Sequence, residues 1–353
     1  MKRLIIGFLF VLFPAVVLAE SGQLGCVPGA SDPARGIVSG CTYFDLQKYG
    51  SMGRQIVFNE AFIEPQIVWT HQSSDAADGG RNVRYNVFCF GFCSPPSLIE
   101  SGWNVGAGEI LPDRAGFPTV AILEDATTVI AQHWNAQYPA GEFNALTYKN
   151  NTIGLPDYSG EWVPDSSWAG YSSGGPQETF VWPQIGHTDN GGSQVSHLLL
   201  SQWRSFDETE DTLNTIVYLR RLGATGSAWQ TGLEIGQSRH YRSAVVVAER
   251  TSDNVLIAWV GPRGDGTIGG APVPRFFGDG SGADAFDTDV YAMFSSDAGA
   301  TWGSRMNLTL RADSLPGGWA PYHKISALWD GGGTAHIVWE ATSWAGYGGV
   351  FTK

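Results

Sequence analysis

A repeated pair of short apolar strands is the feature that most limits how this chain can fold. Five segments share an apolar run, a polar or glycine-rich turn and a second apolar run, which in four of them ends on Trp. The five segments cover residues 54–69, 118–134, 183–200, 243–259 and 323–339. When Ile56, Val120, Ile185, Val245 and Ile325 are taken as equivalent, the spacings are 64, 65, 60 and 80 residues. Self-similarity at this period predicts a repeat architecture.

A second hairpin recurs between these segments. Its strands are predicted over residues 83–88 with 103–110, 215–219 with 229–235, and 289–294 with 302–310. Four strands in about 65 residues predict an all-β fold, a β-propeller of four-stranded blades with about five blades visible. The continuous apolar runs 55–58 and 244–247 indicate inner strands that neighbouring blades cover on both faces. A β-sandwich also uses many short strands, but it does not predict one repeating four-stranded unit with Trp at fixed points.

Composition supports this interpretation and excludes several classes. Glycine accounts for 46 of the 353 residues, 43% of the chain is hydrophobic and 16% is charged. These values favour short strands and tight turns, and they exclude a disordered chain or a coiled coil. The formal net charge of −13 repels phosphate backbones, so no nucleic-acid partner is expected.

The first 19 residues have the order of a secretory signal peptide. Lys2 and Arg3 precede an apolar run over residues 4–13, and the segment closes on Val17-Leu18-Ala19. We therefore expect export, to a periplasm or to the cell surface. Residues 20–41 would then form an N-terminal loop segment and residues 42–353 the propeller domain. No later segment of the sequence is long and apolar enough to span a membrane.

Four cysteines in an exported chain predict two disulfides. Cys89 and Cys93 would face each other at the base of a short hairpin loop, within bridging distance, and Cys26 and Cys41 would then close the N-terminal loop. A zinc site would need further ligands, and no His pair lies near either cysteine pair.

The last repeat stops at residues 350–353, where its third strand is expected. Residues 42–47 could supply a missing strand and close a five-bladed ring by strand exchange. Alternatively, the chain is part of a longer protein in which more blades follow. The sequence leaves both alternatives open.

One octapeptide resembles a known family. Ser295 to Trp302 fits Ser-x-Asp-x-Gly-x-Thr-Trp, which resembles the Asp-box of sialidase-like (BNR-repeat) propellers. Ser295 and Asp297 can bond the backbone N–H groups of the turn, Gly299 can take a positive φ, and Trp302 would anchor the hairpin. In the family the box lies on the outer hairpin of a blade, away from the channel, so the resemblance implies a structural role.

The resemblance also implies what a sialidase would contain. Sialidases of this class grip the substrate carboxylate with three arginines, and they use an Asp acid/base and a Tyr–Glu nucleophile pair. Planar guanidinium groups suit that role because they bind carboxylates bidentately. The nearest approach to the signature of the first arginine is Gly53-Arg54-Gln55-Ile56. No Asp, Glu or Tyr of this chain matches by motif, so the catalytic residues remain unknown.

A candidate ligand face follows from the propeller prediction, because loops that enter inner strands surround one mouth of the channel. The residues just before the inner strands are cations and aromatic rings, which suit an anionic or sugar ligand. They are Arg54, Arg114, Phe117, Trp182, Tyr241, Arg242, Tyr322, His323 and Lys324. The alternative is that they are ordinary solvated rim residues.

An acidic loop and two histidines complete the candidates. Asp279, Asp284, Asp287 and Asp289 could hold Ca²⁺ through oxygen ligands, although their spacing is not that of an EF-hand and a hydrated acidic loop is the alternative. No other metal or cofactor is predicted. His133 and His336 lie within apolar runs, so we expect both to be core residues.

The preferred function is a non-catalytic binding or scaffold propeller of the cell surface or extracellular space. It would recognise carbohydrate or an extracellular protein at the channel face. The alternative is a sialidase-like glycoside hydrolase in which Arg54 and Arg242 grip an acidic sugar. Glycosidases generally need two carboxyl groups flanking the scissile bond, and the sequence reveals no such pair.

Overall fold

The structure is a computed structural model, and all of its described regular structure is β-strand. The described residues are 31–32, 36–37, 42, 53–60, 64–72, 81–89, 102–103, 108–111, 115–123, 125–134, 144–150, 162–164, 179–190, 193–203, 214–223, 227–230, 232–238, 243–262, 267–268, 271–272, 288–309 and 319–343. Over these ranges no helix has the length and hydropathy needed to cross a membrane. The predicted signal peptide, Cys26, Cys41, Cys93 and the strand predicted to begin at Thr42 lie outside them, apart from Thr42 itself. Both disulfides and the domain boundaries therefore stay predictions.

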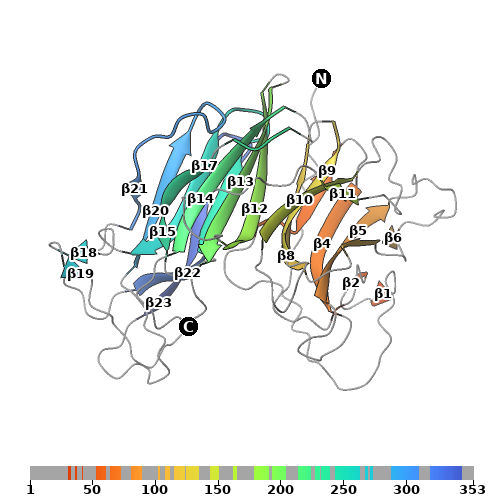
Figure 1. The fold of residues 1–353 in the computed structure, drawn as a ribbon, viewed down its shortest axis with the longest axis horizontal. Helices are drawn as coiled ribbons and strands as arrows, with labels where there is room; N and C mark the ends of the chain where they lie inside the picture. Colours follow the sequence, from red (N-terminus) through yellow and green to blue (C-terminus); the bar gives the residue numbers. More distant parts are fainter. Residues whose placement is uncertain are drawn as a thin grey trace, which may run out of the picture.

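Antiparallel sheets follow one another along the chain (Figure 1). Blade 1 consists of β3 (Ile56–Asn59), β4 (Glu64–Gln72) and β5 (Arg81–Cys89), with β6 (Gly102–Trp103) and β7 (Gly108–Leu111) both paired to β5. Blade 2 consists of β8 (Ala115–Ile122), β9 (Thr128–Trp134), β10 (Asn144–Asn150) and β11 (Trp162–Pro164). Blade 3 consists of β12 (Thr179–Asn190), β13 (Ser193–Trp203), β14 (Asn214–Leu222) and β15 (Leu233–Ser238).

Two further blades complete the succession. Blade 4 consists of β16 (Ala244–Ala248), β17 (Val255–Pro262), β20 (Thr288–Ser295) and β21 (Met306–Asn307). Blade 5 is described by β22 (Trp319–Trp329) and β23 (Ala335–Ser343). Two small hairpins lie apart from the blades: β1 (Ser31–Asp32) with β2 (Gly36–Ile37), and β18 (Thr267–Ile268) with β19 (Ala271–Pro272). Within blades 2, 3 and 4 the strands are neighbours in chain order, so the predicted propeller of four-stranded blades is confirmed.

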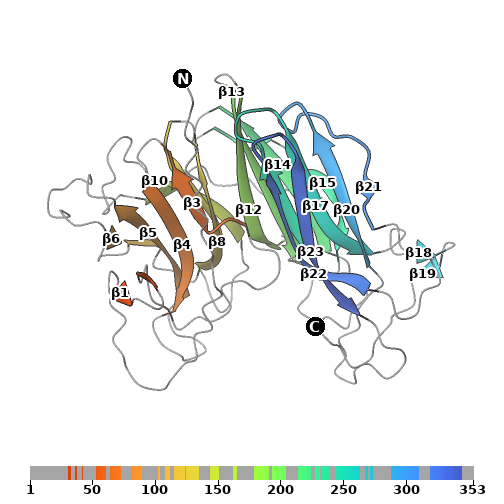
Figure 2. The same ribbon diagram turned by 180° about the vertical axis from the view of Figure 1, so that it is seen from behind.

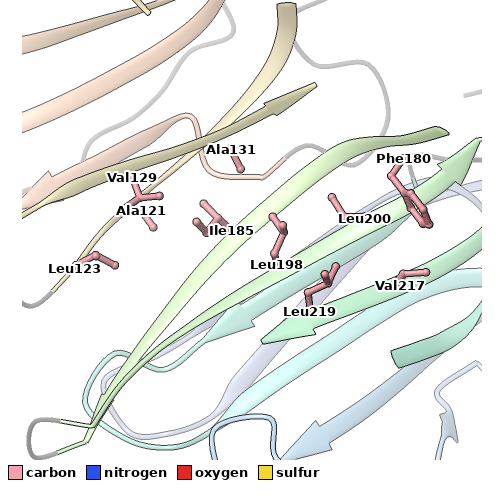
Figure 3. Packing of buried hydrophobic residues seen from close by; sticks show 10 residues of the cluster. All are labelled: Ala121, Leu123, Val129, Ala131, Phe180, Ile185, Leu198, Leu200, Val217 and Leu219. Atoms are coloured by element: carbon pink, nitrogen blue, oxygen red, sulfur yellow. The ribbon is translucent and has the colours of Figure 1, made fainter. Parts of the chain in front are cut away.

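Apolar packing between successive sheets holds the blades together. Four clusters of buried side chains lie at the interfaces of blades 1–2, 2–3, 3–4 and 4–5. Figure 3 shows the second of these, in which Val129 and Ala131 of blade 2 accompany Ile185 and Leu198 of blade 3. None of these clusters, which are built from described residues, joins blade 5 to blade 1.

The predicted equivalence of the five repeats is confirmed by position. Each of the five equated residues lies on the first strand of its blade, and all five line one cavity: Ile56, Val120, Ile185, Val245 and Ile325. The prediction that neighbours cover both faces of the inner strands holds for β16, where four consecutive residues are buried. It is wrong for β3. Ile56 and Phe58 are exposed there because the described part of blade 5 does not pack against them.

The outer strands are shorter than the sequence predicted. The strand predicted over residues 302–310 is only Met306–Asn307, and the one predicted over 229–235 begins at Leu233. The reason is that Trp229 and Trp302 lie in the turns before these strands, where each packs against the interface with the preceding blade. The Trp therefore marks the turn of the hairpin.

Candidate binding site: a cavity between the inner strands

A cavity of about 1020 Å³ lies between the inner strands of all five blades. Its walls come from β3, β8, β12, β16 and β22, and extend onto β4 and β23. Much of the lining is β-branched or aliphatic, because these strands turn apolar side chains both toward the neighbouring blades and toward the middle. Figure 2 shows from behind the side of the molecule on which β3 and the two strands of blade 5 lie.

Arg54, Lys324 and Glu340 are charged groups of the lining at the end where the chain enters the inner strands. Lys324 Nζ lies 3.8 Å from Glu340 Oε2. The carbonyl oxygen of Arg54 accepts a 2.8 Å hydrogen bond from the N–H of Val120, which fixes Arg54 to blade 2. Desolvation lowers the pKa of Arg54, but its side chain is exposed, and a guanidinium with access to water stays charged at any physiological pH.

Arg250 and His187 lie toward the opposite end of the cavity. Arg250 Nη1 is 3.8 Å from Glu60 Oε2, so this ion pair joins blade 4 to blade 1. The carbonyl oxygen of Arg250 also accepts a hydrogen bond from the N–H of Asp189 in blade 3. Burial lowers the pKa of His187 to about 4, so His187 is neutral at pH 7.

Large, partly exposed apolar side chains of blades 1 and 5 line the cavity. Ile56 and Phe58 of β3 are 51% and 50% exposed, and Val338 and Trp339 of β23 are 65% and 39% exposed. A cationic end and an apolar-aromatic wall therefore belong to the same cavity.

A buried aromatic cluster stands where the chain enters the inner strands of blades 2 and 3. The ring centres of Phe117 and Trp182 are 5.4 Å apart, and His133 meets both rings edge to face, at 4.8 Å and 5.4 Å. The guanidinium of Arg81 lies over Phe117, 5.5 Å from the ring centre, and its Nη2 is 3.5 Å from His133 Nε2. Arg81 is thus a cation held in place by stacking.

The backbone at this cluster is strained. Phe117 and Trp182 have φ of 50° and 49°, in the left-handed region that bulky residues rarely adopt. Both lie in β-bulges where the register of the inner strand shifts. The N–H of Phe117 donates to Thr70 Oγ1 at 2.9 Å, so blade 1 helps to hold this conformation.

Only some of the predicted rim residues line the cavity. Arg54 and Lys324 line the cavity, whereas Trp182 is buried in the aromatic cluster, so its ring is not open to the cavity. Tyr322 and His323 lie on the bulged stretch of β22, where only the backbone is described. Arg114, Tyr241 and Arg242 lie outside the described residues, and with them the predicted pairing of Arg54 with Arg242.

Sequence reasoning missed Arg81, Arg250 and Glu340. Arg250 follows an inner strand and Glu340 lies on a second strand, whereas the predicted ligand face consists only of residues that precede inner strands. The blade register offered a signal for Glu340, because Trp339 is the recurrent Trp that ends the second strand and Glu340 follows it. No comparable sequence signal marks Arg81, which begins a third strand.

The octapeptide at Ser295–Trp302 forms the turn between β20 and β21. Asp297 Oδ1 accepts from the N–H of Thr301 at 2.8 Å, and Ser295 Oγ accepts from the N–H of Gly299 at 2.8 Å. The hydrogen bonds from Thr301 hold the pKa of Asp297 down at about 2. Gly299 has φ of 76°, and Ala298 before it has φ of 53°. The local bonds expected of an Asp-box turn are therefore present, and membership of that family stays a prediction.

This turn packs against a buried series of hydrogen-bonded side chains in blade 3. The Tyr218 hydroxyl and His197 Nδ1 are hydrogen-bonded at 2.7 Å, and His197 Nε2 is bonded to Thr188 Oγ1 at 3.0 Å. Trp302 meets Tyr218 edge to face at 5.0 Å. A Cβ added to Gly299 would overlap the Tyr218 hydroxyl. The turn accordingly serves the interface of blades 3 and 4, away from the cavity.

The remaining predicted residues are Asp289 and the two histidines. Asp289 is buried and accepts hydrogen bonds from Asn307 Nδ2 and Thr309 Oγ1, both at 2.7 Å, while Asp279, Asp284 and Asp287 lie outside the described residues. Among the described residues no three His, Cys, Asp or Glu side chains gather as a metal site, and calcium binding stays a prediction. His133 is buried as expected. For His336 the prediction is wrong: it is exposed and paired with Asp330 Oδ2 at 2.9 Å, because it lies on a face of blade 5 that none of the described blades covers.

No protein-family model matches the chain, and no curated protein matches it. Several solved structures are similar in architecture. A protein of unknown function from Dyadobacter fermentans DSM 18053 is 10% identical with a TM-score of 0.45, over 85% of this chain and 82% of that one. An ulvan lyase of polysaccharide lyase family PL25 is 12% identical with a TM-score of 0.46, over 86% and 67%. An endo-arabinase from Bacteroides thetaiotaomicron VPI-5482 is 12% identical with a TM-score of 0.40, over 83% and 89%. Likeness at this level concerns the fold alone.

Proposed function

We propose that this protein is an exported, non-catalytic β-propeller that binds carbohydrate in the cavity between its inner strands. The observation that carries the proposal is the exposed face of Trp339 in the same cavity as Arg54 and the Lys324–Glu340 pair. The signal-peptide pattern of residues 1–19 supports export.

The chemistry of these groups suits a sugar. An exposed indole offers a flat apolar surface for the C–H face of a pyranose, while guanidinium, ammonium and carboxylate groups hydrogen-bond hydroxyls and fix orientation. A cavity of about 1020 Å³ has room for a ligand of several rings. Arg54 and the Lys324–Glu340 pair enter from blades 1 and 5, so a ligand that bridges them would contact both.

The choice of binding over hydrolysis rests on the carboxylates. Glu340 is the one acidic side chain among the described residues that line the cavity, and it is paired with Lys324. The usual glycosidase mechanism needs a second carboxyl group about 5–10 Å away. A sialidase-like hydrolase, the alternative function, would need its second acid and Arg242 to come from the segments outside the described residues.

A glycan array followed by calorimetry tests the proposal. We expect the purified protein to bind a subset of glycans, and Trp339→Ala and Arg54→Gln each to weaken that binding at least tenfold. Arg305→Gln is the matched control, since Arg305 is an exposed cation that stacks on Tyr291 outside this cavity. Absence of glycan binding by the folded protein would contradict the proposal. Turnover of a fluorogenic glycoside panel that includes a sialoside, abolished by Arg54→Gln, would establish the hydrolase instead.

A further inference from the structure

We propose that the cavity wall between blades 1 and 5 is a subsite for the apolar part of an anionic amphiphile, a ligand that joins an acidic group to an apolar chain. The wall is formed by Ile56, Phe58 and Val338. The inference rests on the proposed function only in placing the ligand in this cavity, and it does not require the ligand to be a sugar.

The first step is the exposure of large apolar side chains on two strands that line the cavity, β3 and β23. On β3, Val57 packs into the interface of blades 1 and 2, so Ile56 and Phe58, which alternate with it, point to the other face. On β23, Ile337 packs against the cluster of blades 4 and 5, and Val338 next to it is 65% exposed. Apolar residues thus occupy positions where a solvated sheet face normally carries polar ones.

The second step is the sign of the charges. Arg54, Lys324 and Arg250 line the cavity. Lys324 is paired with Glu340 and Arg250 with Glu60, so Arg54 is the cation of the described lining that lies outside these two ion pairs, in a chain whose net charge is −13. His187 adds no charge at pH 7 because burial lowers its pKa. The guanidinium of Arg54 at one end of the cavity attracts anions and repels cations.

The third step is the arrangement of the two surfaces along one strand. Arg54 precedes β3, and Phe58 lies four residues further on, about 13 Å away at roughly 3.3 Å per residue. An acidic group held at Arg54 would therefore leave an attached chain free to follow Ile56 and Phe58 into the cavity.

A second copy of the protein is the competing occupant of this wall. In a two-fold symmetric contact the same patch meets itself, so the Arg54 guanidinium groups of both copies would be brought into one interface. An anionic small molecule pairs with these cations instead of opposing them, and for that reason we choose it.

The experiment uses a homologous series of carboxylates below their micelle concentrations: hexanoate, octanoate and decanoate, titrated into the purified protein at fixed ionic strength. We expect about a fourfold increase in affinity per added methylene, as for transfer of a CH₂ group from water to an apolar site. Arg54→Gln should weaken the binding of every carboxylate in the series by a similar factor. The increase in affinity per methylene should stay the same in this variant. Alkyltrimethylammonium ions of equal length should bind at least tenfold more weakly, and equal binding would overturn the role of the cations.

Variants of the wall test its place in the site. Phe58→Ser and Val338→Ser should each reduce the increment per methylene toward one, with melting temperatures that stay within a few degrees of the original. Leu233→Ser is the control, because Leu233 is 45% exposed and lies on β15 outside the cavity. An increment unchanged in both wall variants would overturn the inference.

The outcomes separate this inference from the proposed function. If affinity does not depend on the length of the alkyl chain, the apolar subsite is contradicted, while the glycan array still tests carbohydrate binding. Conversely, if affinity rises with chain length and no glycan binds, the subsite is supported and the proposed function is contradicted. Sedimentation that shows a dimer, dissociated by Val338→Ser and insensitive to decanoate, would assign the wall to a contact between copies and overturn the inference.

Discussion

Burial of single titratable residues sets how this fold responds to pH, and Glu64 is the clearest case. Glu64 begins β4, is 4% exposed, and burial raises its pKa from 4.5 to about 7. A carboxyl group whose pKa is raised in the native state keeps its proton up to a higher pH there than in the unfolded state. The contribution of Glu64 to the free energy of unfolding is therefore greatest below pH 4.5 and is lost as the pH rises through about 7.

Glu64→Gln should remove this loss. We expect the variant to exceed the original protein in unfolding free energy at pH 7.5 by on the order of 3 kcal/mol, and to match it near pH 4.5. Urea unfolding at pH 4.5, 6 and 7.5 measures the difference. Glu234→Gln is the control, since Glu234 is an exposed carboxylate on β15. A constant difference between Glu64→Gln and the original protein across the three pH values would contradict the prediction.

Burial of His197 makes the free energy of unfolding change with pH in the opposite direction. It is buried between Thr188 and Tyr218, and burial, followed by the neighbouring His187 and Arg220, lowers its pKa from 6.5 to about 3. A histidine with a lowered native pKa costs stability as the pH falls from 6.5 toward 3. In Glu64→Gln protein, stability should accordingly rise with pH over that window.

At the scale of elements, the β20–β21 turn and the strand pair β13–β14 depend on each other. Gly299 satisfies two requirements at once, a positive φ and the absence of a Cβ next to Tyr218. Ala298 carries the turn to blade 4's own first hairpin, since its N–H donates to the carbonyl oxygen of Asp253. The hairpin is thus fixed on both sides of the blade 3–4 interface.

Gly299→Ala should destabilise the protein by about 3 kcal/mol, the sum of roughly 1 kcal/mol for the left-handed backbone and about 2 kcal/mol for the overlap. Thermal and urea unfolding measure it. Tyr218→Phe in the same chain should restore part of the loss, because the nearest atom to the added Cβ is the hydroxyl oxygen. Gly331→Ala serves as control, since a Cβ there meets nothing within 4 Å. Equal losses at the two glycines would refute this account.

Sequence pattern predicted the inner strands well because their signal is local. The apolar segments around Val245 and Ile185 lie on one strand each, and a short apolar segment followed by a polar or glycine-rich turn is enough to find them. The starts of the outer strands were missed because Trp302 acts through Tyr218 of another blade, a contact that no local pattern encodes. The exposure of Phe58 was missed for the same reason: it depends on which sheet lies opposite. Arg54 and Lys324 were found by position, whereas Glu340 needed the sheet register.

At the scale of the whole molecule, the blades form a series in which each one is stabilised mainly by its neighbours. Four apolar clusters join five blades, and blade 5 is described with a single one, shared with blade 4. Blade 3 takes part in two. In such a series local stability depends on the number of interfaces that a unit shares.

Hydrogen exchange should reveal this gradient. We expect the amides of β23 to exchange at least a hundredfold faster than those of β13, which lies between two clusters and is buried from Val195 to Ser201. Mass spectrometry of peptides covering residues 193–203 and 335–343 measures both rates in one experiment. Equal protection of the two strands would show that blade 5 is covered as well as blade 3, and would contradict the gradient.

The clusters between blades have a consequence for anyone who wishes to divide this protein. A cut between two sheets leaves half of a cluster on each piece: at the junction of blades 2 and 3 it would separate Val129 and Ala131 from Ile185 and Leu198. Both pieces would then expose to water an apolar surface that is buried in the intact protein. The smallest unit that can be separated without this exposure is a pair of sheets with the apolar cluster between them, so a stable fragment must keep the sheets on both sides of each cluster it contains.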